Sequence, residues 1–502
     1  MKYTFLILFT SILTFFSVTA QTKAVKGTWI NLAYQDVRNK YTNPAHVDYT
    51  SPNFWNQKIK EYSEMGISYL IIMAVANERK SYYPSDFMQA AYPADRESPV
   101  EAIMRTADSL GMKVFMSCGW AINQYDDRTS AEIPLLQQRI MREIAAKFGK
   151  QKSFYGWYLP IEDGLFPFLS DEAVEFTNTL TAEGKRLVPS ARVMISPYGL
   201  WMAEVDSEKF ATQIRKLKVD IVAYQDEVGC VREPLPIKKV KQHLKTLGKI
   251  HEGTAIAFWT NVESFTWEKG TNSIESALIP AAFPRYLSQI TGATQAGAKE
   301  IVSFAMYGIY DKPNSDMPIG QPYGTAKAYM DYMDWRAGKG RWPWLEATFK
   351  GSAKHEAAGK KVELKTSTLT TYKQGSLVDG LYGQEDTKDQ RWTAFKNGKM
   401  TAVIDLNESI SITNLAARFL HYRKENIVLP STVTFSRSTD GKNFEKIKTV
   451  SIEISKNDQH DCWIDMAFVE NIAKTARYIK VEVEGEQDTL IMCDELLVNM
   501  VR

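Results

Sequence analysis

Carboxylate residues stand at the ends of apolar runs in this sequence, and their placement suggests acid–base chemistry. Glu162 follows FYGWYLPI, Asp226 and Glu227 follow DIVAYQ, and Glu263 lies in FWTNVESF. A pair of carboxyl groups can cleave a glycosidic bond, because one protonates the leaving oxygen while the other attacks the sugar or activates water. The pattern therefore favours glycoside hydrolysis.

Glu162 is the expected proton donor, because its apolar surroundings disfavour the charged form and raise the pKa of a carboxyl group. Two candidates for its partner remain open: Glu263, and the adjacent pair Asp226 and Glu227. Each acid could instead have a structural role, since a carboxylate after a strand can cap the next helix or pair with a nearby Lys or Arg.

Amide and aromatic side chains stand at the same run ends, where amides could bind sugar hydroxyls and rings could contact the C–H face of a sugar. The expected substrate-binding residues are Tyr34, Gln35, Asn77, Trp120, Tyr198, Gln225, Trp259, Asn261 and Tyr307. Trp29 and Trp157 fall inside the runs and are expected in the core. Of the six His residues, only His251 falls in such a run, near its start, so a His-based nucleophilic site or zinc site is poorly supported.

A repeated unit of helix, glycine and apolar strand supplies the elements that would position these residues. Residues 51–77 and 98–120 both begin with Ser-Pro, continue with an apolar stripe at helical spacing, stop at a glycine and end in a strand-like run. Eight such strands are expected, at 27–36, 68–77, 113–120, 154–163, 192–199, 220–227, 249–259 and 300–308. The count predicts an α/β fold, a (β/α)8 TIM barrel over residues 25–340, whose strand ends share one mouth. A doubly wound sheet is the alternative, because strand order cannot be read from sequence.

The residue composition and pattern of the chain change after residue 340. Residues 341–364 mix Gly, Pro and Lys and are expected to form a linker. Short runs of β character with turn signals then follow, at 400–406, 409–420, 431–438, 445–454 and 476–485. They predict an all-β sandwich over residues 365–502.

The first 20 residues have a Lys, an apolar stretch and a small residue, Ala20, before Gln21, which is typical of a secretory signal peptide. Residues 1–20 are therefore expected to direct export to the periplasm or outside the cell. The formal net charge of +2 favours no nucleic-acid partner, and no later run is long enough for a membrane span. The four cysteines have no metal-site spacing, although Cys462 and Cys493 could form a disulfide.

Two resemblances to known families add to this interpretation. The barrel segment, with WINLAYQD, GWYLPIED, YQDEVG and FWTNVESF, resembles a family of exported bacterial TIM barrels of unknown function that is close to glycoside hydrolases. That resemblance implies the (β/α)8 fold and a sugar-directed site, but no particular reaction. Acids after the fourth and seventh strands are also similar to the Glu pair of the largest clan of retaining glycosidases, which favours Glu263 as nucleophile.

The C-terminal segment, with SLVDGLYG, RWTAF, AVIDL, VTFSRSTDGKNFEKI and ARYIKVEVEG, resembles the coagulation factor V/VIII type C, or discoidin-like, domain. The resemblance implies a jelly-roll sandwich, a carbohydrate-binding role and a structural calcium ion, without a defined set of ligands. No cofactor is expected for catalysis.

The combined interpretation is an exported glycoside hydrolase that acts on an oligo- or polysaccharide, with Glu162 as acid/base and Glu263 as nucleophile. Retention of configuration requires the two carboxyl groups to lie about 5 to 5.5 Å apart, and inversion requires about 6.5 to 9.5 Å. One alternative is a non-catalytic glycan-binding protein on a barrel scaffold. Another is a polysaccharide lyase, in which Tyr34, Tyr198 or Tyr307 would act as the base.

Overall fold

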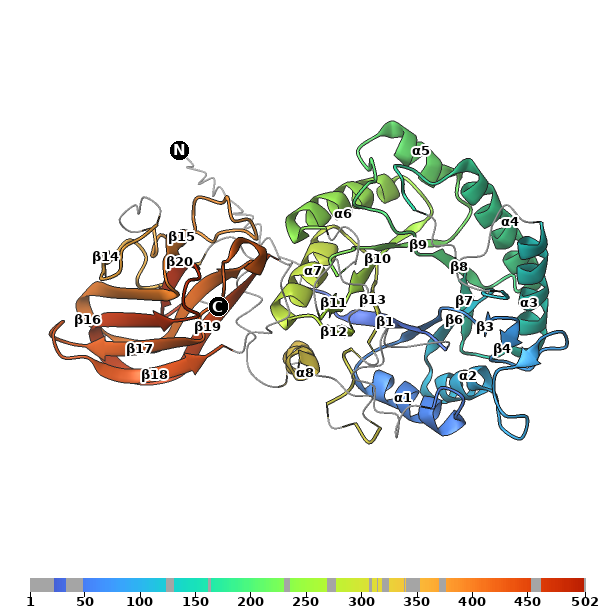
Figure 1. Cartoon of the computed structure of the whole chain (residues 1–502), viewed down its shortest axis with the longest axis horizontal. Coiled ribbons are helices and arrows are strands. Elements are labelled where there is room, and N and C mark those ends of the chain that lie inside the picture. Colours follow the sequence, from blue (N-terminus) through green and yellow to red (C-terminus); the bar gives the residue numbers. More distant parts are fainter. Residues whose placement is uncertain are drawn as a thin grey trace, which may run out of the picture.

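A computed structural model of the chain (Figure 1) provides the structure. It describes residues 22–32, 48–122, 131–160, 164–229, 235–268, 277–306, 309–313, 315–317, 325–337, 339, 353–369, 376–452 and 462–500.

Eight parallel strands close into a barrel, which confirms the predicted (β/α)8 fold. In order around the barrel they are β1 (Val25–Ile30), β2 (Tyr69–Ile72), β6 (Lys113–Ser117), β7 (Phe154–Tyr158), β8 (Arg192–Ile195), β9 (Ile221–Gln225), β10 (Ala257–Glu263) and β13 (Ile301–Phe304). Spatial order follows chain order, as in a TIM barrel, so the doubly wound alternative is wrong.

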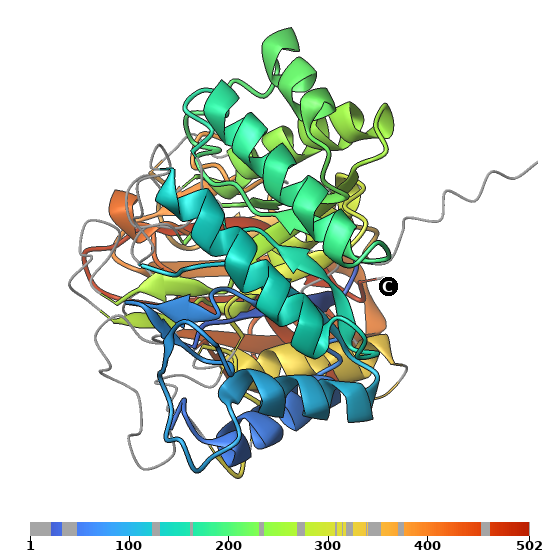
Figure 2. The same cartoon turned by 90° about the vertical axis from the view of Figure 1, so that its right-hand side faces the viewer.

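Helices form a ring outside the strands (Figure 1), and the side view shows several of them covering the strands (Figure 2). They are α1 (Pro52–Glu64), α2 (Pro99–Leu110), α3 (Glu132–Phe148), α4 (Asp171–Leu187), α5 (Glu208–Lys216), α6 (Ile237–Glu252), α7 (Phe283–Gln295) and α8 (Thr325–Arg336). The Ser-Pro start works as expected in α2, where Ser98 and Glu101 form a reciprocal capping box. Gly111 ends that helix with φ 67°, a left-handed conformation that glycine adopts without a steric cost.

Two small sheets lie outside the barrel order. One contains β3 (Ala76–Asn77), β4 (Lys80–Ser81) and β5 (Gln89–Ala90), and the other pairs β11 (Phe265–Trp267) with β12 (Leu278–Pro280). Among the helices in the described parts of the chain, none is long and apolar enough to cross a membrane.

The seventh strand lies later in the chain than the sequence suggests. The expected range 249–259 begins inside α6, which continues to Glu252, whereas β10 runs from Ala257 to Glu263. The apolar residues at 249–252 continue the helical spacing of α6, so the sequence pattern does not mark where the helix ends. His251 therefore lies at a helix end, where its ring bonds the hydroxyl group of Tyr224 at 3.0 Å.

Alternate residues of the strands fill the barrel interior, as the two-residue period of a strand requires. The interior cluster includes Trp29, Ile71, Phe115, Tyr158, Met194, Ala223, Trp259 and Val302. Trp157, one residue before Tyr158, faces the helices instead, and its indole N–H donates to the carbonyl oxygen of Gly184 at 3.2 Å. Trp29 and Trp157 are thus both buried, as predicted.

An all-β unit follows the barrel, as predicted, and its strands pair antiparallel. The strands are β14 (Lys361–Leu364), β15 (Thr393–Phe395), β16 (Lys399–His421), β17 (Thr432–Ser438), β18 (Glu445–Ser451), β19 (Trp463–Glu484) and β20 (Ile491–Val498), with a 3-10 turn, η1 (Arg423–Glu425). Two runs expected to be separate strands, 400–406 and 409–420, belong to the single long strand β16, whose pairing with β19 shifts register between Asp405 and Ile410.

This unit begins before the predicted boundary at residue 365. Strand β14, expected as linker, pairs with β16. The backbone N–H of Ala353 donates to Gly380 at 2.9 Å, and the ring of buried His355 bonds Glu495 at 2.9 Å. The linker prediction of 341–364 is therefore wrong for residues 353–364, because their backbone and side chains bond within the β unit. The suggested disulfide is also wrong, since no disulfide joins Cys462 to Cys493.

Candidate active site at the carboxyl ends of the strands

Three of the predicted acids lie at the carboxyl ends of neighbouring strands. Asp226 and Glu227 follow β9, and Glu263 is the last residue of β10. All three are buried. In a TIM barrel this end of the strands forms the mouth in which catalytic side chains gather.

Glu263 belongs to the row of β10 that faces the barrel interior. Trp259 lies in the interior cluster, whereas Phe258 and Val262 pack in the larger core that includes the helices. Since side chains alternate along a strand, Asn261 and Glu263 share the interior face with Trp259. Glu263 is thus the residue that this row places nearest the mouth.

The surroundings of Glu263 favour its neutral form. Burial, and then the neighbouring charges of Asp226 and Glu227, raise the pKa of Glu263 well above its usual value. Two features oppose this shift: the positive charge of Arg285 and the backbone N–H of Gly229, which donates to Oε2 at 2.7 Å. Burial and like charge prevail, so the neutral form of this carboxyl group is favoured relative to that of an ordinary Glu.

Asp226 faces the helices, and both of its oxygens have donors. Oδ1 accepts from the backbone N–H of Glu263 at 3.1 Å, and Oδ2 accepts from the amide of Gln289 at 2.6 Å. Burial raises the pKa of Asp226 to about 6 although these bonds favour the charged form. Asp226 therefore connects β10 to α7 and has the contacts of a bracing residue.

Glu227 holds the loop that follows β8. Its Oε1 accepts from the backbone N–H groups of Gly199 and Leu200, the latter at 3.1 Å, and its Oε2 accepts from that of Trp201 at 3.3 Å. Burial raises the pKa of Glu227 to about 7 in spite of these donors. The carboxyl group is thus fully occupied in ordering a loop.

That loop carries an aromatic cluster at the rim of the mouth. The ring of Phe166 lies edge-on to those of Tyr198 and Trp201, with centroids 5.3 and 5.8 Å apart. Phe166 itself is exposed. Tyr198, one of the predicted binding residues, therefore lies beside Phe166, which in turn contacts Trp201; the sequence interpretation selected neither of these two rings. The sequence could have identified them, because Phe166 and Trp201 come soon after the fourth and fifth expected strands.

Two predicted amides meet above the interior cluster. The side-chain N–H of Gln225 donates to the carbonyl oxygen of Ser196 at 3.0 Å, and that of Asn261 contacts the Ser196 hydroxyl at 3.5 Å. Oδ1 of Asn261 is buried without a hydrogen-bond partner in the described parts of the chain. The ends of β9 and β10 thus present amide groups close to Glu263, and Ser196 after β8 binds both of them.

Trp259 is not at a strand exit, contrary to expectation. It is only 2% exposed and packs against the rings of Tyr69 and Phe115, with centroids 5.0 and 5.9 Å apart. The later start of β10 moves Trp259 from the end of the strand to its middle. Trp120 is also buried, in the same interior cluster, and Asn77 lies in the small outer sheet, opposite Lys80.

Four predicted site residues lie outside the described residues: Tyr34, Gln35, Glu162 and Tyr307. The separation of Glu162 from Glu263, and with it the stereochemical outcome, therefore stays a prediction.

Two further residues near the acids come from α7. Gln289 bonds Asp226, and Arg285, which is fully buried, donates to the carbonyl oxygen of Phe265 and lowers the pKa values of Asp226 and Glu263 by its charge. Their four-residue spacing puts two polar side chains on the buried face of a helix, a sequence signal that could have identified them. Among the described residues, no group of three or more His, Cys, Asp or Glu could hold a metal ion.

Comparisons with solved structures return distant matches. A "putative alpha-L-fucosidase" from Bacteroides thetaiotaomicron is 16% identical, with 62% of this chain and 92% of that chain covered and a TM-score of 0.48. A CBM32 module of a family 31 glycoside hydrolase from Clostridium perfringens is 14% identical, with 30% and 98% covered and a TM-score of 0.22. Chitosan-binding module 1 of a chitosanase/glucanase from Paenibacillus is 16% identical, with 29% and 98% covered and a TM-score of 0.21. These similarities are too low to assign an activity.

No curated protein is detectably similar in sequence to this chain. A family model does match, over residues 25–317, which span the barrel and more than half of the chain. The chain therefore belongs to the family described as "Domain of unknown function (DUF4434)".

Proposed function

We propose that the barrel hydrolyses glycosidic bonds and that Glu263 is one of the two reacting carboxyl groups. The observation that carries the proposal is the position of Glu263, a buried carboxyl group with a raised pKa at the mouth end of the interior row of β10. A carboxyl group that keeps its proton at neutral pH can donate it to a leaving oxygen. The amides of Gln225 and Asn261 beside it suit sugar hydroxyls.

The raised pKa assigns Glu263 the role of proton donor in this proposal, in place of the nucleophile expected from the sequence. A nucleophile must be ionised, and burial together with two neighbouring acids opposes ionisation of Glu263. The second carboxyl group is then Glu162, on the sequence argument alone. Asp226 and Glu227 suit this role less well, because the protein's own donors occupy their oxygens.

We propose the remaining features from sequence. The discoidin-like motifs support a carbohydrate-binding role for the β unit, and the signal-like first 20 residues support export to the periplasm or beyond. A calcium ion in the β unit stays a prediction.

A non-catalytic glycan-binding barrel is the second candidate. It is favoured by the fact that Asp226 and Glu227 both bond backbone or helix groups, as structural acids do. In that case the amides and the aromatic rim would bind sugar without turnover.

Glu263→Gln distinguishes the two candidates, because it keeps the shape of the side chain and removes its proton. Purified protein would be incubated with plant, mucin and microbial glycans, and the released sugars quantified. Loss of a proton donor lowers turnover by about 10²- to 10⁴-fold while leaving glycan binding intact. The matched control is Glu204→Gln, at an exposed acid in the loop after β8. Wild-type turnover in Glu263→Gln would remove Glu263 from the mechanism, and no turnover by the wild type on any glycan would favour the binding protein.

A further inference from the structure

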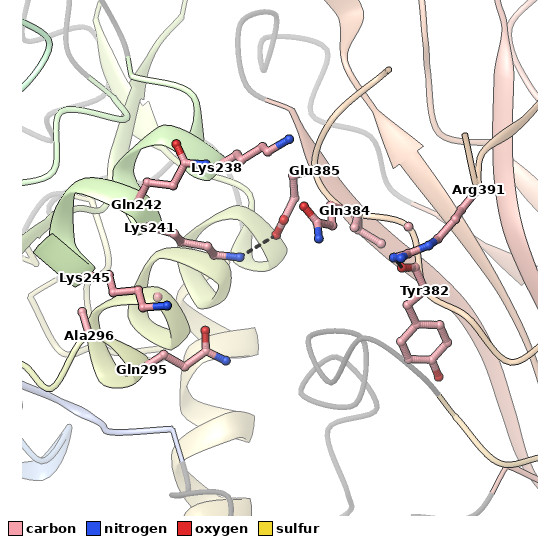
Figure 3. A pocket seen from close by; sticks show the side chains of 13 residues that line it. Lys238, Lys241, Gln242, Lys245, Gln295, Ala296, Tyr382, Gln384, Glu385 and Arg391 are labelled. Atoms are coloured by element: carbon pink, nitrogen blue, oxygen red, sulfur yellow. Dashed lines mark hydrogen bonds and ion pairs between the residues drawn. The ribbon is translucent and has the colours of Figure 1, made fainter. Parts of the chain in front are cut away.

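A cavity lies on the outside of the barrel, where it meets the β unit (Figure 3). Its volume is about 430 Å³, and its walls come from α6, α7 and the loop that precedes β15. None of the predicted catalytic or substrate-binding residues lines it. The cavity is therefore separate from the site at the barrel mouth.

Ion pairs across this junction fix the two walls relative to each other. Nζ of Lys241 in α6 lies 3.0 Å from Oε1 of Glu385, and Nζ of Lys238 lies 2.8 Å from Oδ2 of Asp386. The Glu385 carboxylate is buried, accepts a second bond from the Ser288 hydroxyl, and has a pKa below its usual value, chiefly through the charge of Lys241 acting against burial. The contacts around Glu385 thus hold the cavity open in a defined shape.

One positive charge on the cavity wall is not balanced in this way. Lys245 follows Lys241 by four residues, so both lie on the same face of α6, and Lys245 points into the gap between the walls (Figure 3). Within the described parts of the chain, Lys245 has no ion-pair partner. On the opposite wall, Arg391 donates to the carbonyl oxygen of Tyr382 at 2.7 Å and lies 4.0 Å from Asp389.

The rest of the lining is mainly polar. The exposed amide side chains of Gln242, Gln295 and Gln384 line the cavity, whereas Tyr382 and Ile464, which also border it, are almost fully buried. Amides bind hydroxyl groups, which suits a ligand with many hydroxyl groups, such as a sugar. Small-molecule sites commonly have volumes of about 300 to 1,000 Å³, a range that includes this cavity.

We propose that this cavity is a second saccharide site that binds an acidic sugar, with the carboxylate of a hexuronic acid on Lys245 and the hydroxyl groups on the glutamine amides. The anionic character of the ligand follows from the unbalanced charge of Lys245. The choice of a sugar over other anions rests on the proposed carbohydrate-directed function of the barrel.

The experiment is a calorimetric titration of the full chain with trigalacturonic acid, compared with neutral galactotriose and with inorganic phosphate. The expected result is binding of trigalacturonic acid that weakens with added salt, as a charge-assisted contact should. Lys245→Ala should weaken it about tenfold, through loss of one charge-assisted hydrogen bond. Ala296→Trp, which fills the cavity without removing a charge, should abolish it.

Lys249→Ala is the matched control, because this exposed lysine lies one turn further along α6 and does not line the cavity. Equal effects of Lys245→Ala and Lys249→Ala would overturn the proposal, as would absent binding of trigalacturonic acid. Binding of galactotriose or phosphate with the same affinity would also contradict it. Circular dichroism and thermal midpoints confirm that each variant is folded.

Failure of this proposal and failure of the proposed function are distinguishable. Chromatography of the trigalacturonic acid recovered after each titration shows whether any was cleaved during the measurement. Binding of the intact ligand should depend on Lys245 whether or not Glu263 is catalytic, whereas turnover by the wild-type barrel is measured separately on the glycan panel.

Discussion

Replacing Glu227 by Ala removes the acceptor of three backbone N–H groups, those of Gly199, Leu200 and Trp201. Each buried donor that loses its partner lowers the stability by about 1 to 3 kcal/mol. Two of the three hydrogen bonds are long, so the lower value, about 1 kcal/mol for each bond, applies here. The expected loss of unfolding free energy is therefore about 3 kcal/mol. Residues 199–201 should lose part of their order, because these bonds connect them to the residues that follow β9.

The cost of Glu227→Ala should depend on pH, with a sign fixed by the direction of the pKa shift. The pKa of Glu227 is raised from 4.5 to about 7, so the folded chain holds a proton that the unfolded chain releases. Stability supplied by the wild-type residue is then fully present below about pH 4.5 and is reduced as the pH rises to about 7. A shift of this size corresponds to about 3 kcal/mol, so the variant should cost about 3 kcal/mol at pH 4 and close to nothing at pH 8.

Urea denaturation at the two pH values measures the global effect, and hydrogen exchange of the amides at 199–201 locates it. At pH 4 these amides should exchange about a hundredfold faster in the variant. The control is Glu204→Ala, which removes an exposed acid from the same loop. Unchanged exchange at 199–201, or a cost that grows with pH, would show that Glu227 does not hold the loop as described.

Three other substitutions test neighbouring contacts. Asp226→Asn cannot ionise, whereas the wild type loses stability as the pH rises from about 4 to 7, because the pKa of Asp226 is raised to about 6. The urea midpoint of the variant should therefore increase relative to that of the wild type over this pH range. A difference in midpoint that does not change with pH would contradict the raised pKa. In Gly229→Ala the new methyl group would lie 2.2 Å from the carbonyl oxygen of Phe265 and 3.2 Å from Glu263 Oε2, so glycan turnover should fall sharply, and normal turnover would refute this close approach. Lys241→Met leaves buried Glu385 without its cation and should cost about 3 to 5 kcal/mol by urea denaturation, compared with no change in Lys249→Met.

The barrel could be predicted because its signals are local and repeated. Ser-Pro starts, glycine stops and apolar runs recur along the chain, and the eight observed strands fall within or beside the expected ones. The boundary errors also have a local cause. The helical pattern of α6 merges with the expected strand at 249–259, and only the paired backbone of β10 shows that the strand begins at Ala257.

The candidate site was predicted in part, for a physical reason. Sequence located Asp226, Glu227 and Glu263 at strand ends, but it could not show which oxygens the protein already occupies. Those contacts come from residues distant in sequence, such as Gln289 on α7, and they separate the bracing acids from Glu263. The start of the β unit was missed similarly, because β14 is defined by its pairing with β16.

The dependence of rate on the leaving group tests the central claim, that Glu263 donates the proton, most directly. A pair of aryl glycosides would be made from the sugar that the glycan panel identifies, one with a dinitrophenol leaving group and one with a poor phenol. A good leaving group needs no protonation, so kcat/KM, which reports cleavage of the glycosidic bond, should stay near the wild-type value for Glu263→Gln on the dinitrophenyl glycoside and fall about 10²- to 10⁴-fold on the poor one. Equal losses of kcat/KM on both substrates would contradict a proton-donor role for Glu263.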